Sequence, residues 1–109
     1  MNKEELNVAL RMELINYQTT NVLTDDLRRL FLECIIYASK KEVYKNLSDN
    51  LRIYCEAKAY EDCCKHTSNF PHERCKNAYA YVGQIIGSSF ACMIVRHGKY
   101  SKTKETHEA

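Results

Sequence analysis

The side chains with the most reactive chemistry gather between positions 63 and 75, where the sequence has Cys63, Cys64, His66, His72 and Cys75. Taken from Cys63 as C-x2-H-x5-H-x2-C, this stretch offers four ligands of the kinds that hold zinc in a tetrahedral site. The pairs are closer together than in common zinc fingers, and Cys64 also fits an apolar stripe, where cysteine is a frequent small core residue. We therefore expect no bound metal, and a small zinc-binding helical module stays an alternative.

Motifs of catalysis are absent from the sequence. It contains no GxGxxG, GxxxxGK[ST], HExxH or GxSxG pattern. A cysteine and histidine pair could be assembled in several ways, but six cysteines and four histidines make such pairs expected by chance. We expect a protein that is not an enzyme and needs no cofactor.

The composition is typical of one small helical domain. A chain of 109 residues can bury a single core, and three glycines with one proline favour helices over turn-rich strands. No stretch reaches the roughly 18 apolar residues of a membrane span, and the acidic start MNKEEL does not resemble a signal peptide. We therefore expect a cytoplasmic protein with free thiols. The net charge of +2 does not by itself indicate a nucleic-acid binder.

Helical spacing and capping residues predict four helices that pack as a compact bundle. The first covers about residues 3–17, the second follows Thr24 or Asp25, the third begins near Ser48, and the last runs from Asn77 to Gly98. Their expected buried faces are, in order, Leu6, Leu10, Leu14 and Tyr17; Leu27, Leu30, Phe31, Cys34, Ile35 and Ala38; Ile53, Ala57, Tyr60 and Cys64; and Val82, Ile85, Ile86, Ser89, Phe90 and Met93. Residues 1–98 form one predicted domain, and the polar residues 99–109 a predicted disordered tail.

The stretch Glu61 to Arg96, EDCCKHTSNFPHERCKNAYAYVGQIIGSSFACMIVR, resembles region 2 of bacterial sigma factors. It is most similar to the late-transcription sigma factors of large tailed phages, whose KNxxAYxxQ core is matched by Lys76-Asn77, Ala80-Tyr81 and Gln84. The resemblance implies an all-α sigma region 2 fold. It also implies a factor that binds the RNA polymerase core of an infected host cell and recognises a −10-like promoter element. Nothing resembles sigma region 4, so a co-activator would have to supply that function.

The resemblance implies a surface that captures unpaired bases of the non-template strand. Opening a promoter requires aromatic rings on which bases stack and cations that hold phosphates. The expected stacking residues are Tyr79 and Tyr81, and Gln84, three residues after Tyr81, is placed to pair with an adenine edge. The full expected DNA-binding set is Phe70, Arg74, Lys76, Asn77, Tyr79, Tyr81, Gln84, Arg96, Lys99 and Lys102.

The third helix is where the resemblance implies docking on a coiled coil of the largest polymerase subunit. The expected contacts are Leu51, Arg52, Tyr54, Cys55, Lys58, Glu61 and Asp62. A different hypothesis fits the same helices: a polymerase-binding adaptor or anti-sigma protein that reads no DNA.

Overall fold

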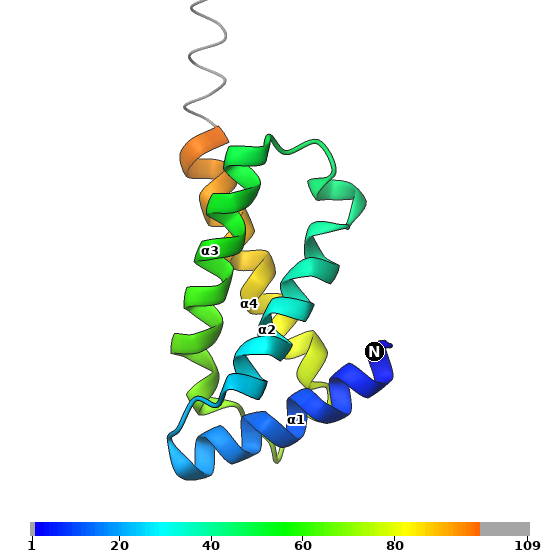
Figure 1. Ribbon diagram of the computed structural model, residues 1–109, viewed down its shortest axis with the longest axis vertical. Coiled ribbons are helices and arrows are strands. Elements are labelled where there is room, and N and C mark those ends of the chain that lie inside the picture. Colours follow the sequence, from blue (N-terminus) through cyan, green and yellow to red (C-terminus); the bar gives the residue numbers. More distant parts are fainter. Residues whose placement is uncertain (1, 99–109) are drawn as a thin grey trace, which may run out of the picture.

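In the computed structural model, residues 2–98 are described and form four α-helices with short helical turns between them (Figure 1). The helices are α1 (Lys3–Thr20), α2 (Asp25–Ser39), α3 (Asp49–His66) and α4 (Ala78–Met93). Two 3-10 turns, η1 (Glu42–Tyr44) and η2 (Thr67–Asn69), precede and follow α3, and a π-helical turn, η3 (Ile94–Gly98), continues α4. No strand occurs within residues 2–98, so the predicted all-α fold with four helices is confirmed. The predicted tail at 99–109 lies outside the described residues.

Polar side chains fix where the helices begin. Thr24, Ser48 and Asn77 each accept a hydrogen bond from the backbone N–H three residues later, at 3.0–3.2 Å. Such caps satisfy first-turn N–H groups that have no partner inside the helix, and each contributes about 0.5–2 kcal/mol. The sequence predicted helix starts at these positions, with Asp25 and Asp49 as alternatives to Thr24 and Ser48. Asn2 caps α1 in the same way, with 2.8 Å between its Oδ1 and the Glu5 nitrogen.

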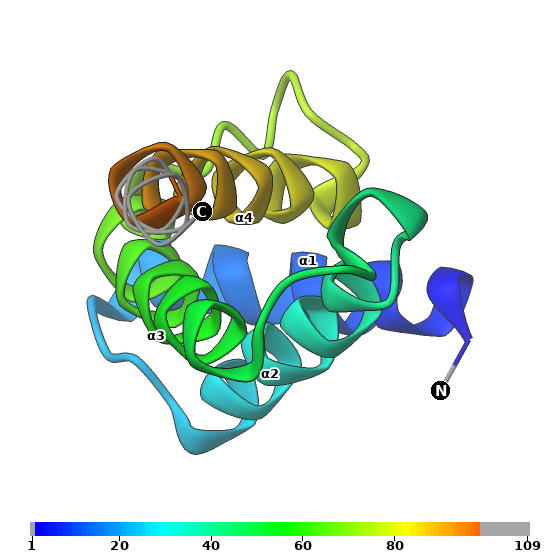
Figure 2. The ribbon, with the colours of Figure 1, turned by 90° about the horizontal axis from the view of Figure 1, so that it is seen from above.

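Three of the helices run along the long axis of the molecule, and α1 lies across one end of it (Figure 1). Seen from above, α4 lies on one side, with α2 and α3 opposite it (Figure 2). α4 contacts all three other helices, and its closest association is with α3. Within residues 2–98, α3 and α4 thus form the most extensive contact between two helices.

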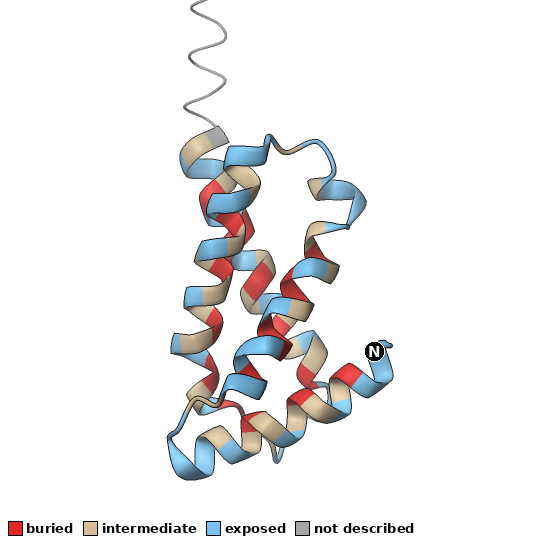
Figure 3. Ribbon diagram, in the orientation of Figure 1, coloured by how far each residue is buried: buried red, intermediate tan, exposed pale blue. Residues whose placement is uncertain are grey.

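Buried side chains line the inner faces of the helices (Figure 3). The predicted faces of α1, α2 and α4 are confirmed, except that Tyr17 and Ile85 are only partly buried. The predicted face of α3 is wrong: its buried residues are Cys55, Ala59 and Cys63, whereas Ile53 is 60% exposed. Apolar or small side chains stand on several sides of α3, so the spacing along the chain fits more than one face.

One helix has the length and composition of a membrane span, contrary to the expectation from the sequence. Ala78–His97 has a mean hydropathy of 1.4 over its most apolar window. In the fold, however, this helix is the one against which α1, α2 and α3 all pack. The compact globule that results favours a soluble protein, and the cytoplasm stays an expectation.

Candidate functional site

A cleft of about 480 Å³ lies between α3 and α4. Its walls are Lys58, Asp62 and His66 from α3, with Tyr81, Gln84, Ile85, Ser88, Ser89 and Cys92 from α4. We call it the α3–α4 cleft. Its volume falls within the ~300–1,000 Å³ typical of sites for small organic groups, and an aromatic ring, an amide, hydroxyls and a cation share it.

Tyr81 and Gln84, which the sequence predicts on one face, do lie together in this cleft. The Tyr81 ring is fixed by an edge contact with the Phe70 ring, at 5.1 Å between centroids. Its hydroxyl donates to the backbone oxygen of His66 at 3.4 Å. Burial raises the pKa of Tyr81 above its usual value, so the phenol stays neutral and keeps its donor at physiological pH. The exposed Gln84 amide is one turn further along the wall.

A polar link between the helices forms the floor of the cleft. The Ser89 hydroxyl donates to Oδ2 of Asp62 at 2.6 Å, and Lys58 Nζ lies 3.2 Å from Oδ1 of the same carboxylate. Ser89 is 2% exposed and is also 2.9 Å from the backbone oxygen of Ile85. A hydroxyl held in this way is inaccessible to a substrate, so the link serves to position α3 against α4. Lys58, with a 33% exposed side chain, lies on the wall of the cleft with its charge balanced by Asp62.

The two tyrosines expected to stack bases together point to different sides of α4. Residues two apart on a helix are about 200° apart around its axis. Tyr79 lies against α1, where its ring is 6.0 Å from Lys3 Nζ. Burial, with Cys34 and Tyr37 of α2 nearby, raises its pKa. The two rings therefore do not form one stacking surface, and of the two only Tyr81 faces the α3–α4 cleft.

Two expected contact residues are buried. Phe70, expected to contact DNA, is 0% exposed and supports Tyr81 from inside. Cys55, expected to contact polymerase, is also 0% exposed, and its thiol lies 3.8 Å from the backbone oxygen of Phe90. Both expectations are corrected, because a side chain without accessible surface cannot touch a partner in this conformation.

The remaining expected DNA contacts are spread over both ends of the molecule. Arg74 and Lys76 are exposed in the α3–α4 loop, and the Asn77 side chain is committed to its cap on α4. Arg96 lies at the far end, beside Ser88, Ala91, Cys92 and Val95. Lys99 and Lys102 lie outside the described residues.

The expected polymerase contacts are divided between different surfaces of α3. Lys58 and Asp62 belong to the α3–α4 cleft. Tyr54, 52% exposed, stacks on the ring of His97 at 5.1 Å. Glu61 is exposed and pairs with Lys65 at 2.6 Å, which lowers the pKa of the carboxyl. Leu51 and Arg52 are partly buried near the start of the helix.

The residues of the possible zinc site are not brought together. Cys63 is 0% exposed, and burial raises its pKa to about 12. His72 Nδ1 is 2.9 Å from Oε1 of Gln18 on α1. The Cys75 thiol lies 3.5 Å from the backbone oxygen of Asn77. Within residues 2–98, no three histidine, cysteine or acidic side chains cluster as metal ligands would, so this geometry does not support the zinc alternative.

A second hollow, which the sequence reasoning missed, is an apolar groove of about 470 Å³ between α2 and α3. Its lining is Leu32, Ile35, Ile36, Ile53, Glu56, Ala57 and Tyr60. Leu32, Ile36 and Ile53 are 49–60% exposed, and large apolar side chains grouped on a surface indicate a protein contact. We call this the α2–α3 groove. The sequence does carry a signal for this groove, because α3 has more apolar residues than one buried face needs. Those residues were interpreted as part of the core.

No protein-family model matches the chain, and no curated protein has a significantly similar sequence.

Proposed function

We propose that this chain is a promoter-specificity factor of the phage late-transcription type, which binds a host RNA polymerase core and captures an unpaired base of a −10-like element. The observation that carries the proposal is the sharing of one cleft by Tyr81 and Gln84. The pattern from Glu61 to Arg96 that resembles sigma region 2, to which both residues belong, also supports it.

The α3–α4 cleft has the chemistry that base capture needs. The Tyr81 ring offers a stacking surface, worth about 1–3 kcal/mol for a base. The Gln84 amide both donates and accepts, which matches the adjacent donor and acceptor of an adenine edge. Lys58 lies at the same opening, but its charge is balanced by Asp62 at 3.2 Å. Recognition therefore combines stacking with one directional amide contact, and the chain's own residues carry out no bond-making step.

The test is whether core polymerase opens a promoter in the presence of the purified chain. Opening is measured by the chemical reactivity of unpaired thymines, and transcription by the amount of run-off RNA. We expect Tyr81→Ala to abolish opening while binding to polymerase is retained, and Tyr81→Phe to keep most of the opening because the ring remains.

Tyr17→Ala is the matched control. Tyr17 is also partly buried, and its hydroxyl also donates to a backbone oxygen near the end of α3, that of Cys64, at 3.2 Å. Its loss should cost similar stability without affecting opening. Opening by Tyr81→Ala at the wild-type level would exclude the base-capture role.

The α2–α3 groove favours a second candidate, a polymerase-binding adaptor or anti-sigma protein without DNA readout. Ile36 and Ile53 are more than half exposed, so Ile36→Asp with Ile53→Asp should leave the fold intact and reduce co-purification with polymerase. Val43→Asp, at a position 75% exposed outside the groove, is the control. Polymerase binding that needs the groove, together with no promoter-dependent RNA from the wild type, would favour the adaptor.

A further inference from the structure

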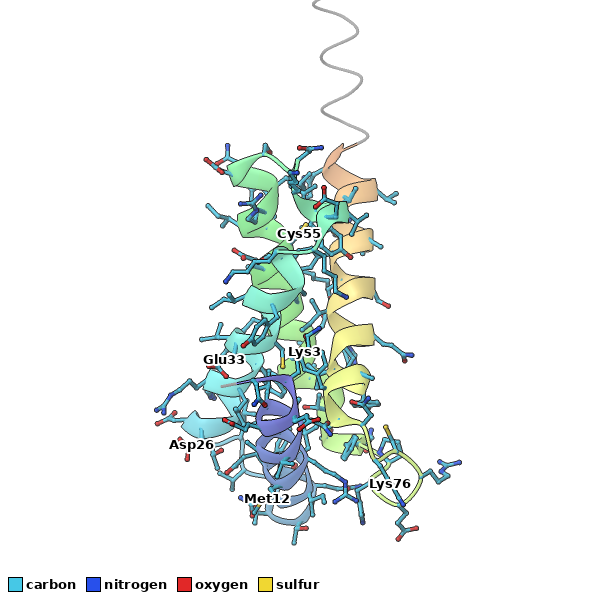
Figure 4. The ribbon with its side chains drawn as sticks, turned by 90° about the vertical axis from the view of Figure 1, so that its right-hand side faces the viewer. Lys3, Met12, Asp26, Glu33, Cys55 and Lys76 are labelled. Carbon is cyan, nitrogen blue, oxygen red and sulfur yellow. The ribbon has the colours of Figure 1, made fainter. Side chains whose placement is uncertain are left out.

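A row of residues on α1 lies beside the loop that leads into α4. Lys3, Asn7 and Arg11 are spaced four residues apart and therefore share one face of the helix. Asn7 and Arg11, with Val8, Met12 and Lys76, line a hollow of about 420 Å³. Figure 4 shows Met12 and Lys76 at the same end of the molecule. We call Lys3, Asn7, Val8, Arg11, Met12 and Lys76 the α1 basic surface.

Its cations are not neutralised by the protein. Within residues 2–98, no carboxylate forms an ion pair with Lys3, Arg11 or Lys76. The Arg11 Nε is buried without a hydrogen-bond partner in that part of the chain. The acidic side chains Asp26 and Glu33 lie on the other side of α1 from Lys76 (Figure 4). The positive charge is thus available to an anion from outside.

The carboxylates closest along the chain keep their charge but form no ion pair with these cations within residues 2–98. Glu5 is engaged with Asn2 at the start of α1, at 3.2 Å, and Glu13 accepts from the Thr24 hydroxyl at 3.0 Å. Glu4 and Glu73 are exposed and form no ion pair among the described residues.

Hydrogen bonds fix this surface relative to the start of α4. The Tyr79 backbone N–H donates to Oδ1 of Asn7 at 2.9 Å, and Arg11 Nη2 donates to the His72 backbone oxygen at 3.1 Å. Tyr81, which lines the α3–α4 cleft, is two residues beyond Tyr79. These hydrogen bonds hold the α1 basic surface and the loop with Arg74 and Lys76 in place at the start of α4, and the α3–α4 cleft begins at the next turn of that helix, on another side.

The surface combines charge with exposed apolar atoms. Val8 is 59% exposed and Met12 67% exposed, beside two cations. A nucleotide strand matches both features, because phosphates pair with the cations while sugars and base faces cover the apolar side chains. Lys3 and Arg11 are eight residues apart, or about 12 Å along the helix, so they suit an extended chain of phosphates better than one small anion.

We propose that the α1 basic surface binds the sugar-phosphate backbone of the single strand whose base enters the α3–α4 cleft. The inference rests on the proposed function, since it extends the path of that strand. It assigns a DNA contact to α1, a helix in which the sequence predicted no DNA-binding residue.

The test is fluorescence anisotropy of a labelled single-stranded oligonucleotide over a range of salt concentrations. Arg11→Gln with Lys76→Gln should reduce the slope of log affinity against log salt by about 1.4, since each lost contact on a single strand removes about 0.7. The affinities of variant and wild type converge at about 1 M salt. At about 0.1 M salt, one decade lower, the variant should therefore bind the oligonucleotide up to about 25-fold more weakly. Lys40→Gln with Lys41→Gln removes the same charge from exposed positions outside this surface and should change nothing.

Further variants separate the two proposals and exclude a folding artefact. Arg11→Lys with Lys76→Arg keeps both charges and should bind as the wild type does. An unchanged slope in the Gln variant, with weaker binding by Tyr81→Ala, would overturn the α1 contact and leave base capture standing. A reduced slope without promoter-dependent RNA would support the α1 contact and contradict the promoter function. Binding of the wild type to phosphatidylserine vesicles but not to the oligonucleotide would overturn the α1 contact in favour of a membrane surface.

Discussion

Removing the Ser89 hydroxyl tests whether the link between α3 and α4 holds the cleft in shape. In Ser89→Ala, the Asp62 carboxylate loses its 2.6 Å hydrogen bond while its side chain is only 15% exposed. A hydrogen bond to a charged group contributes about 1.5–3 kcal/mol. Lys58 remains paired with the other carboxylate oxygen, so we expect the lower part of this range, about 1.5–2 kcal/mol. For a chain of this length, that lowers the melting temperature by about 7–9 °C.

The assay is thermal and urea unfolding of Ser89→Ala, Asp62→Ala and the double variant. A double-mutant cycle isolates the pair, and we expect a coupling energy of about 1.5 kcal/mol. Ser88→Ala is the matched control, because it makes the same chemical change at the adjacent, exposed position of α4. It should stay within about 0.5 kcal/mol of the wild type.

A coupling energy below about 0.5 kcal/mol, or equal melting temperatures for Ser89→Ala and Ser88→Ala, would refute the reasoning. The carboxylate would then be held by Lys58 and water alone, and the floor of the cleft would not depend on the link.

The other predictions concern the core and its thiols. Phe90→Ala should destabilise the fold by about 3–5 kcal/mol in urea unfolding, because the ring is fully buried against Tyr44. Iodoacetamide at neutral pH should modify the exposed Cys92 before the buried Cys34 and Cys63, as peptide mass mapping would show. Burial raises the pKa of both buried thiols from 9.0 to about 12, so the unfolded chain ionises first and stability should fall from about pH 9 towards pH 12.

Capping residues and helical spacing were enough to predict the four helices themselves. Thr24, Ser48 and Asn77 mark helix starts because a short polar side chain satisfies the first free N–H groups, whatever the rest of the chain does. The faces of α1, α2 and α4 followed in the same way, since one clear apolar stripe leaves one way to pack. The shared face of Tyr81 and Gln84 was also a local result, fixed by helical spacing.

The buried face of α3 was decided by tertiary structure. This helix offers Ile53, Ala57 and Tyr60 on one side and Cys55, Ala59 and Cys63 on another. The small second set is buried because α4 packs closely there, and the larger set is left to line the α2–α3 groove. Choosing between them requires the position of the neighbouring helices, which spacing along α3 does not contain.

The surfaces that could bind a partner also combine features that the sequence determines with features that only the packing of the helices decides. The sequence by itself determined four helices, the starts of three of them and a Tyr81–Gln84 face, because all of these follow from interactions within a few residues. Only the tertiary structure placed Tyr79 beside Lys3 of α1, closed the α3–α4 cleft with Asp62, and brought Arg11 beside Lys76. Those arrangements join residues far apart in the chain, and their contact depends on how the helices pack.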